Sequence, residues 1–383
     1  MTSIFKPFNK LFTPVSTISP GVYHYIAPQD DERNYRMHLR IEHDGHGVLI
    51  INASTVLHLN QTATEYAYYF VNNVTAAEVS RIMSKRYHVS AEQARHDYQD
   101  TTDRILTLIE MPDLDPVTFL DFERRSPYSG RISAPYRLDC AITYQLPAGV
   151  NEELAPEERV DRELTTDEWF NIIDKAWQVG IPHLVFTGGE PTLRSDLPEF
   201  ISRAETNGQV SGLLTDGLRF ADNQYLNSLL MTGLDHILML CQPESDTFWQ
   251  SLDNVTSADI FTAIHLTLTP ENLPGAHDLL RSLSERGVQA ISLSITDETL
   301  SENLSQLTDY AASMHLSLVW DLPVPYSRLN PVSLEVRSTR HVEAAGRAWL
   351  YIEPDGDVLA AQGSDYRLGN LLSDPWEKIW KQG

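Results

Sequence analysis

Residues 183–196 read HLVFTGGEPTLRSD and join an apolar run to a helical pattern through two glycines. Leu184–Thr187 is a short apolar run, and the paired glycines Gly188 and Gly189 allow a tight turn before the next helical pattern. From Tyr136 onward, similar apolar runs alternate with helical patterns. This alternation predicts an α/β fold in which crossover helices join parallel strands.

We expect about seven strands in this part of the chain, and the first is Arg137–Tyr144. The others are predicted at Leu184–Thr187, Val210–Thr215, His236–Cys241, Ile260–Thr267, Ala290–Ser294 and Leu316–Leu322. The first main helix is predicted to follow the capping pair Thr165 and Glu168, and its apolar face would carry Trp169, Ile172, Ile173, Ala176 and Trp177. The other main helices are predicted at Leu197–Glu205, Leu279–Arg286 and Asn303–Ala312. Seven strands are too few for a closed eight-stranded barrel, so we expect an open, partial barrel.

The first hundred or so residues carry a different pattern. Three short strands are predicted at Gly21–Ala27, Met37–Glu42 and Val48–Asn52, and the turn His43–Gly47 joins the last two as a hairpin. Three helices follow, and we expect capping boxes that begin at Thr62, Thr75 and Ser90. This order predicts a small α+β, winged-helix-like domain.

Composition narrows the class of protein. The chain has 383 residues, a formal net charge of −24 and two cysteines. The acidic balance argues against nucleic-acid and anionic-membrane binding, because phosphate contacts need clustered Lys and Arg. Two cysteines cannot form a disulfide framework, and no secretory signal or apolar membrane span is visible, so we expect a cytoplasmic protein.

The stretch Phe186–Leu193 resembles the strand-end motif with which radical SAM enzymes hold the amino group of S-adenosylmethionine. The resemblance implies that the cofactor would be bound by Gly188, Gly189, Glu190, Pro191 and Thr192, with Thr215 and Asp216 at the end of the next strand. Cys241–Glu244 departs from the family pattern at the position that contacts the ribose, so S-adenosylmethionine is expected only as a possible ligand. The alternative is that the two glycines serve only as a tight turn.

The same family carries three cysteines spaced Cys-x3-Cys-x2-Cys after the first barrel strand. The corresponding positions here hold Leu146, Val150 and Glu153. The C-terminal part resembles the SPASM/twitch extension, in which Ala361 stands where a cluster cysteine is expected. On this ligand count we expect no iron–sulfur cluster and no metal site, and hence a degenerate, pseudoenzyme-like member of the family.

The N-terminal pattern resembles the PqqD-like peptide-recognition element (RRE) of ribosomal-peptide maturation systems. This resemblance completes the predicted organisation. The parts are an N-terminal tail (1–19), the PqqD-like domain (20–112), a linker (113–133), the partial barrel of radical SAM type (134–335) and the SPASM-like extension (336–383).

The leading functional hypothesis is a non-catalytic protein that binds a peptide or protein partner, such as a leader peptide added as a strand at the sheet edge Met37–Asn52. A second hypothesis is a non-radical enzyme that uses Glu190, Asp216 and Asp139 as acid–base groups. A third is a radical SAM peptide-modifying enzyme whose cluster comes from a partner chain. The oligomeric state is left open.

Three further features are expected to be structural. His43 and His46 are expected to serve the hairpin turn. Cys140 and Cys241 are expected to be buried as small hydrophobes within strands. The acidic stretch 151–159 is expected to form a solvated loop.

Overall fold

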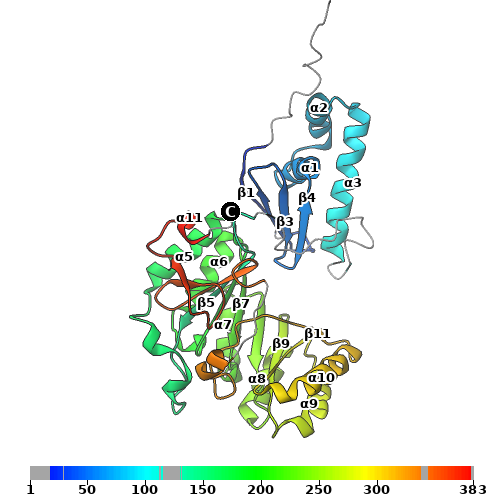
Figure 1. Ribbon diagram of the computed structural model, residues 1–383. Helices are drawn as coiled ribbons and strands as arrows, with labels where there is room; N and C mark the ends of the chain where they lie inside the picture. The colour runs from blue at the N-terminus through cyan, green and yellow to red at the C-terminus, as the bar shows by residue number, and fades with distance from the viewer. Residues whose placement is uncertain are drawn as a thin grey trace, which may run out of the picture. The chain divides into compact units, whose positions relative to one another are not determined.

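The computed structural model describes residues 18–28, 30–111, 114, 130, 132–337 and 344–380. The chain divides into two compact units, Met1–Ser129 and Gly130–Gly383 (Figure 1). Most of the predicted tail and linker lies outside the described residues. The domain boundaries predicted within the second unit stay predictions. In the described ranges, no helix has the length and hydropathy needed to cross a membrane.

The first unit is a four-stranded antiparallel sheet followed by three helices. Its strands are paired in chain order: β1 (Gly21–Ile26), β2 (Arg36–Ile41), β3 (Gly47–Ile51) and β4 (Thr55–Leu59). Its helices are α1 (Gln61–Val71), α2 (Ala76–Tyr87) and α3 (Ala91–Glu110). β4 was not predicted. The turn that precedes it places Asn52 and Ala53 at positive φ, and a search for turns based on Gly and Pro misses such a turn.

The extra strand changes which backbone can accept a peptide. β3 pairs with both β2 and β4, and β2 pairs with both β1 and β3, so both strands of the predicted edge Met37–Asn52 lie inside the sheet. That prediction is therefore wrong. Within the described part of this unit, β1 and β4 are the strands that pair on one side only.

Two of the three predicted N-cap residues in this unit are confirmed, each by the first of the two hydrogen bonds of a capping box. The side chains of Thr75 and Ser90 accept the backbone N–H groups of Glu78 and Gln93, as predicted. The first helix instead begins after Asn60, whose side chain accepts the N–H of Ala63. The prediction of Thr62 was wrong because Asn is as good an N-cap as Thr and precedes it here.

The second unit is built on one ten-stranded sheet. In spatial order its strands are β11 (Ser317–Leu318), β10 (Ala290–Ile295), β9 (Phe261–Leu268), β8 (His236–Leu240), β7 (Val210–Thr215), β6 (His183–Gly188), β5 (Arg137–Thr143), β12 (Trp349–Ile352), β13 (Asp357–Leu359) and β14 (Arg367–Asn370). β5 to β11 are the seven predicted strands, and each pairs in parallel with its neighbour. Since β11 and β14 end the sheet, it does not close on itself, and the predicted α/β class is confirmed.

The C-terminal hairpin belongs to this same sheet. β12 runs parallel to β5 and pairs Trp349 with Arg137 and Ile352 with Cys140, while β13 returns antiparallel to β12. A hairpin with its turn at Pro354–Asp357 therefore extends the main sheet. Its resemblance to a SPASM extension stays a prediction.

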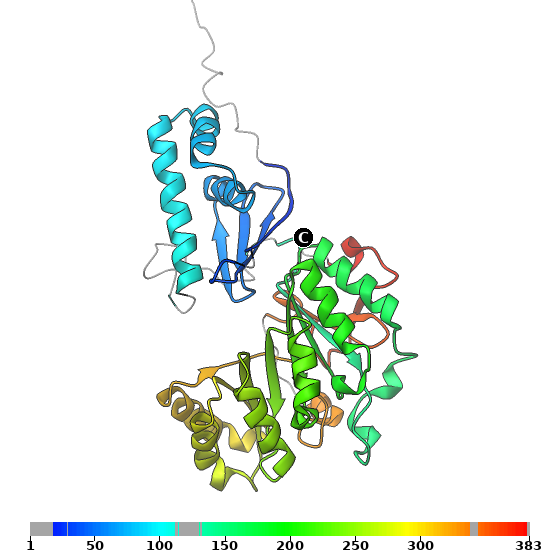
Figure 2. The same ribbon diagram turned by 180° about the vertical axis from the view of Figure 1, so that it is seen from behind.

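The helices of the second unit pack on one face of the sheet (Figures 1 and 2). They are α5 (Thr166–Gln178), α6 (Leu197–Asn207), α7 (Asn223–Leu230), α8 (Asp246–Thr256), α9 (Ala276–Glu285), α10 (Ser301–Ser313) and the short α11 (Trp376–Ile379). Their apolar side chains form a single cluster with alternate strand residues such as Cys140, Phe186 and Leu213. Thr165 and Glu168 form the predicted capping box of α5. The opposite face of the sheet is therefore the one available for a site.

Candidate functional site

The predicted glycines lie where the ends of β5 and β6 meet. The N–H of Gly189 donates to the Thr143 carbonyl at 2.9 Å, and that of Glu190 donates to the Gln145 carbonyl at 2.8 Å. A Cβ at Gly188 would stand 2.1 Å from the Thr143 carbonyl oxygen, and one at Gly189 would stand 2.3 Å from that of Gln145. Gly188 also has φ of 128°, which disfavours other residues. The packing of two strand ends is thus sufficient to require both glycines.

The Gly188 carbonyl has a partner within the chain, because it accepts the N–H of Tyr326 at 2.9 Å. The neighbouring hydroxyl of Thr187 donates to the Pro323 carbonyl at 3.0 Å. The segment after β11 is therefore tied to the end of β6. The predicted role of Gly188 and Gly189 in holding S-adenosylmethionine stays a prediction.

Glu190 is a buried carboxylate that receives hydrogen bonds from both sides of the β6–β7 gap. Its Oε1 accepts from the N–H of Thr192 at 2.9 Å, from the Thr192 hydroxyl at 2.5 Å and from the Thr215 hydroxyl at 2.7 Å. Its Oε2 accepts from the N–H of Asp216 at 2.7 Å. The structure thus brings together Glu190, Thr192, Thr215 and Asp216, with Pro191 between the first two along the chain. The predicted role of these residues in binding S-adenosylmethionine stays a prediction.

Glu190 and Asp216 form a pair of carboxyl groups with perturbed acidity. Burial and the nearby charge of Asp216 together raise the pKa of Glu190 from 4.5 to about 8, against the opposing effect of the hydrogen bonds from the Thr192 hydroxyl, the Asp216 N–H and the Thr215 hydroxyl. Burial also raises the pKa of Asp216. Two carboxyls in these surroundings favour holding one proton between them.

Asp139, the third acid–base candidate, lies apart from this pair. It stands opposite Val185 in the β5–β6 register, five residues before Glu190 along the chain. It is buried, and Arg137 donates to both its oxygens, from Nε at 2.7 Å and from a terminal nitrogen at 3.1 Å. Asp139 therefore belongs to an ion pair near the start of β5.

The positions that correspond to cluster cysteines in the radical SAM pattern hold no thiol. Leu146 packs against a cluster that contains Tyr144 and Tyr326, Glu153 is exposed and accepts from Asn151, and Val150 and Ala361 have no ionisable group. Within the described ranges, no group of three or more His, Cys, Asp or Glu side chains is arranged to hold a metal ion.

The two cysteines lie far from each other. Cys140 and Cys241 are buried in the core cluster, as predicted. Cys140 is on β5 and Cys241 directly follows β8, so three strand spacings of about 4.8 Å separate them. The residues of this chain therefore do not fit a cluster that needs three thiolates.

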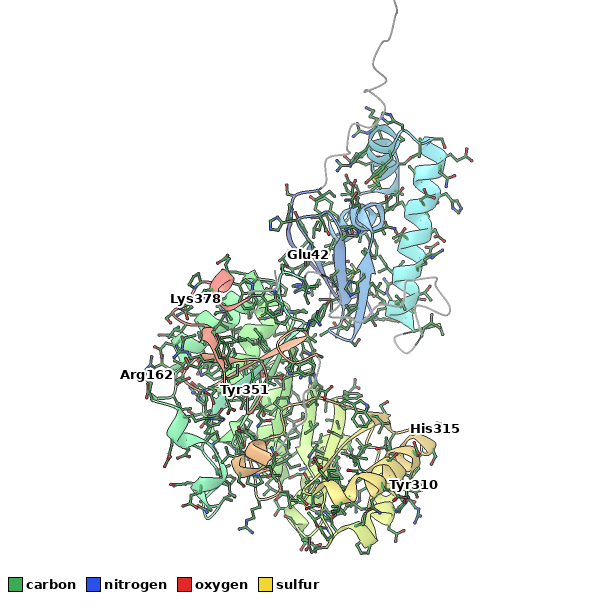
Figure 3. All side chains as sticks on the ribbon, in the orientation of Figure 1. Glu42, Arg162, Tyr310, His315, Tyr351 and Lys378 are labelled. Carbon is green, nitrogen blue, oxygen red and sulfur yellow. The ribbon has the colours of Figure 1, made fainter. Side chains whose placement is uncertain are left out.

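A polar network behind Tyr144 was not predicted. Arg159 lies 3.2 Å from Glu353 and 3.2 Å from Glu335 and donates to the Tyr326 hydroxyl at 3.2 Å. Tyr144 donates to Glu353 at 3.0 Å, and its hydroxyl lies 3.3 Å from that of Tyr351. Figure 3 labels Tyr351 among the strands of the second unit. Arg159 is the last residue of the acidic stretch 151–159, so these contacts hold the C-terminal end of that stretch in place.

Comparisons with known proteins bear on the family and the fold of this chain. Residues 140–266 match the radical SAM superfamily. The predicted resemblance to that superfamily is confirmed for this segment. A PqqA peptide cyclase from Granulibacter bethesdensis is 39% identical over 85 residues, a match that spans 22% of this chain and 22% of that relative.

Solved structures of Streptococcus suis SuiB show the fold. SuiB bound to its precursor peptide SuiA superimposes with a TM-score of 0.59, 13% identity, and coverage of 93% of this chain and 88% of that one. SuiB bound to S-adenosylmethionine gives a TM-score of 0.55 with 14% identity over the same shares. At these identities the likeness supports the α/β architecture and no individual residue.

The prediction that no iron–sulfur cluster accompanies the protein is wrong by these comparisons. Radical SAM homologues normally carry iron–sulfur clusters and bind S-adenosylmethionine, and SuiB was solved with S-adenosylmethionine bound. The prediction rested on a count of the cysteine ligands in this chain alone. That count says which ligands this chain supplies, and it does not settle whether the working protein carries an iron–sulfur cluster.

Replacing Gly189 with alanine tests whether this glycine is needed for packing alone. We expect Gly189→Ala to lower the free energy of unfolding by about 1–3 kcal/mol without any ligand, because its Cβ would overlap two backbone carbonyls. Gly275→Ala is the matched control, since a Cβ there meets nothing within 4 Å, and its effect should stay within about 0.5 kcal/mol. Urea unfolding followed by circular dichroism gives both values. Equal stability of the two variants would contradict the packing argument.

The coupling of Glu190 and Asp216 predicts a pH dependence. Since the folded pKa of Glu190 exceeds its unfolded value of 4.5, its contribution to stability is full below about pH 4.5 and is lost as the pH rises through about 8. Asp216→Asn removes a charge that raises this pKa, so the titration of Glu190 should move to lower pH. The ¹³C carboxyl shift of Glu190, with the exposed Asp278→Asn variant as control, measures the midpoint. An unmoved midpoint in Asp216→Asn would refute the coupling.

Proposed function

We propose that this chain is a peptide-binding protein of the radical SAM peptide-modifying type, which recognises a precursor peptide and binds S-adenosylmethionine. The observation that carries the proposal is the radical SAM match at residues 140–266, which contains the Glu190 site. The names of the relatives support a peptide partner: one is a PqqA peptide cyclase, and another was solved with a precursor peptide bound.

The first unit supplies the peptide-binding surface in this proposal. An antiparallel sheet accepts an extended peptide at a strand whose outer backbone groups lack a strand partner. In the described part of this unit, β1 and β4 are such strands. β1 carries Tyr23 and Tyr25, which are half-buried against the unit's core, and the exposed Ile26 at its end. These side chains give an added strand apolar surface to cover.

The strand-end site supplies the S-adenosylmethionine pocket. The four hydrogen bonds to Glu190 come from this chain's own donors, three to Oε1 and one to Oε2. Glu190 therefore acts as a positioning residue for Thr192, Thr215 and Asp216. Asp216 is only partly buried, and its Oδ1 accepts the N–H of Leu218 at 2.9 Å. In this proposal the carboxyl of Asp216 faces the ammonium group of the ligand.

A second candidate function is acid–base catalysis without radical chemistry. The observation in its favour is the Glu190–Asp216 pair, because coupled carboxyls with raised pKa are typical of acid–base sites. Asp139 does not join this pair, since its two oxygens are held by Arg137. Turnover that is lost in Asp216→Asn and is insensitive to S-adenosylmethionine would favour this candidate over the first.

Calorimetric titration of the full chain with S-adenosylmethionine tests the pocket. We expect saturable binding that is about tenfold weaker in Asp216→Asn, because one charge-assisted hydrogen bond contributes about 1.5 kcal/mol. Asp278→Asn removes the same charge from an exposed position on α9 and should bind as the unchanged protein does. An absence of heat at millimolar ligand, or equal weakening in the two variants, would count against the pocket.

Hydrogen exchange tests the peptide surface. A peptide selected by display against the full chain serves as the probe, and amide exchange is compared with and without it. We expect slower exchange along Gly21–Ile26 or Thr55–Leu59, because an added strand hydrogen-bonds the outer backbone groups of an edge. A scrambled peptide is the control. Protection confined to residues 130–383 would contradict the assignment to the first unit.

A further inference from the structure

Two histidines of the second unit meet at the end of the main sheet where its parallel strands begin. His183 is the first residue of β6 and His236 is the first residue of β8, with β7 between these strands. The two Nε2 atoms lie 3.4 Å apart, and the two ring centroids lie 5.0 Å apart. The length of β6, roughly 17 Å, separates His183 from Gly188, so the pair is remote from the strand-end site of Glu190.

A glycine on the strand between the histidines allows them to meet. β6 and β8 lie two strand spacings apart, about 10 Å, and Gly212 of β7 stands opposite His236 in the register. A Cβ at Gly212 would lie 2.0 Å from Nε2 of His236 and 2.4 Å from its Cε1. The ring of His236 therefore occupies the space that a side chain at position 212 would fill, and it reaches over β7 to His183.

The contact between the two rings is poorly shaped for a hydrogen bond. N–H···O bonds in proteins measure about 2.7–3.2 Å, and the two Nε2 atoms are 3.4 Å apart. The centroids are farther apart than the nitrogens by less than two ring radii, so the rings do not point at each other along one line. The planes of the rings are inclined by 65°. A hydrogen bond between these nitrogens would be both long and bent.

The same separation fits two nitrogens that are bound to one metal ion. Zn–N bonds measure about 2.0–2.1 Å and zinc prefers a tetrahedral arrangement, so two nitrogens on one zinc ion lie about 3.3–3.4 Å apart. That separation agrees with the 3.4 Å between the Nε2 atoms of His183 and His236. When each neutral ring carries its proton on Nδ1, both Nε2 atoms offer a lone pair to one ion.

The surroundings suit neutral imidazole ligands. Burial, the neighbouring ring and Arg137 hold the pKa of His183 well below its usual value, and burial with Arg137 lowers that of His236 to about 4. The charge of Arg137 is offset by Asp139, which accepts from its Nε at 2.7 Å. Both histidines are partly exposed, so water molecules can reach an ion between them.

We propose that His183 and His236 form a binding site for a divalent transition-metal ion, with Zn²⁺ as the ion that their spacing fits and water as its remaining ligands. Imidazole suits such ions, whereas Mg²⁺ and Ca²⁺ prefer oxygen ligands. β6 and β8 each pair with β7, and the ion would join their first residues directly. This site does not depend on the proposed function.

The number of ligands sets the expected strength of binding. In the part of the chain that the structure describes, no third His, Cys, Asp or Glu joins the two histidines in a metal-binding group. Structural zinc sites use four protein ligands, so we expect weaker binding here than at such a site. Removal of a residue that only supports a metal ligand typically weakens binding 10–100-fold, so removal of either histidine should weaken it by at least about tenfold.

Calorimetric titration of the metal-free full chain with ZnCl₂, in a buffer that does not bind zinc, tests the site. We expect saturable binding that loses one equivalent of zinc in His183→Gln and the same equivalent in His236→Gln. His96→Gln, at an exposed position of α3, is the matched control and should keep that equivalent. MgCl₂ should give no saturable heat, and this comparison changes the ion alone. An absence of heat at millimolar ZnCl₂, or equal binding by all variants, would overturn the proposal.

X-ray absorption at the zinc edge identifies the bound ligands. For the chain loaded with one equivalent of zinc, we expect two imidazole nitrogens at about 2.0–2.1 Å, with oxygen atoms as the other neighbours. The imidazole signal should fall in His183→Gln and stay unchanged in His96→Gln. An unchanged signal in His183→Gln would show that the zinc lies elsewhere and would overturn the assignment.

Gly212→Ala tests the geometry while both histidines remain. Its Cβ would displace the ring of His236, so we expect the equivalent of zinc to be lost. Gly275→Ala, where a Cβ meets nothing within 4 Å, should bind zinc as the unchanged chain does. Circular dichroism checks that both variants are folded. Zinc binding retained in folded Gly212→Ala would contradict the proposed geometry, and if that variant does not fold, the histidine variants and the MgCl₂ comparison decide.

Discussion

The carboxylate of Glu190 is the group around which the strand-end site is arranged. Moving an ionised carboxylate out of water costs several kcal/mol, so it must be protonated, hydrogen-bonded or both. Here the turn after β6 supplies two donors and the end of β7 supplies two more. Thr192, Thr215 and Asp216 are thereby fixed relative to one another, while the contacts of Gly188 and Gly189 hold the turn against β5.

Much of the second unit could be predicted from the sequence because parallel strands are buried on both faces and appear as continuous apolar runs. All seven predicted strands are present, and β7 has the predicted bounds. The first unit was harder, since β4 follows a turn of Asn52 and Ala53 and changes which strands form the sheet edges. Pairing order depends on contacts between distant residues, which local patterns do not encode.

In the candidate site, too, residues at the ends of adjacent strands could be predicted to lie together, whereas contacts between residues far apart in the sequence could not. Glu190 and Asp216 could be placed together because the ends of adjacent parallel strands meet at one edge of a sheet. The partner of Asp139 could not be recognised as Arg137 from periodicity alone, although the two lie on the same strand face. The Arg159 network joins residues up to 209 positions apart, from Tyr144 to Glu353, and no spacing rule finds it. The cluster prediction failed because it treated one chain's ligand count as a statement about the working protein.

The pairing of β12 with β5 also bears on how this unit comes to be folded. β5 is the first strand of its sheet in the chain and β12 follows more than 200 residues later, yet Leu350 pairs directly with Leu138. Contacts of such long range slow folding, because closing a long loop is entropically unfavourable. At synthesis rates of about 5–20 residues per second, the β12 side of β5 stays unpaired with its native neighbour for roughly 10–40 s on the ribosome. During that interval a strand with a buried, apolar sequence is exposed to any chaperone, or any nascent chain, that can pair with it.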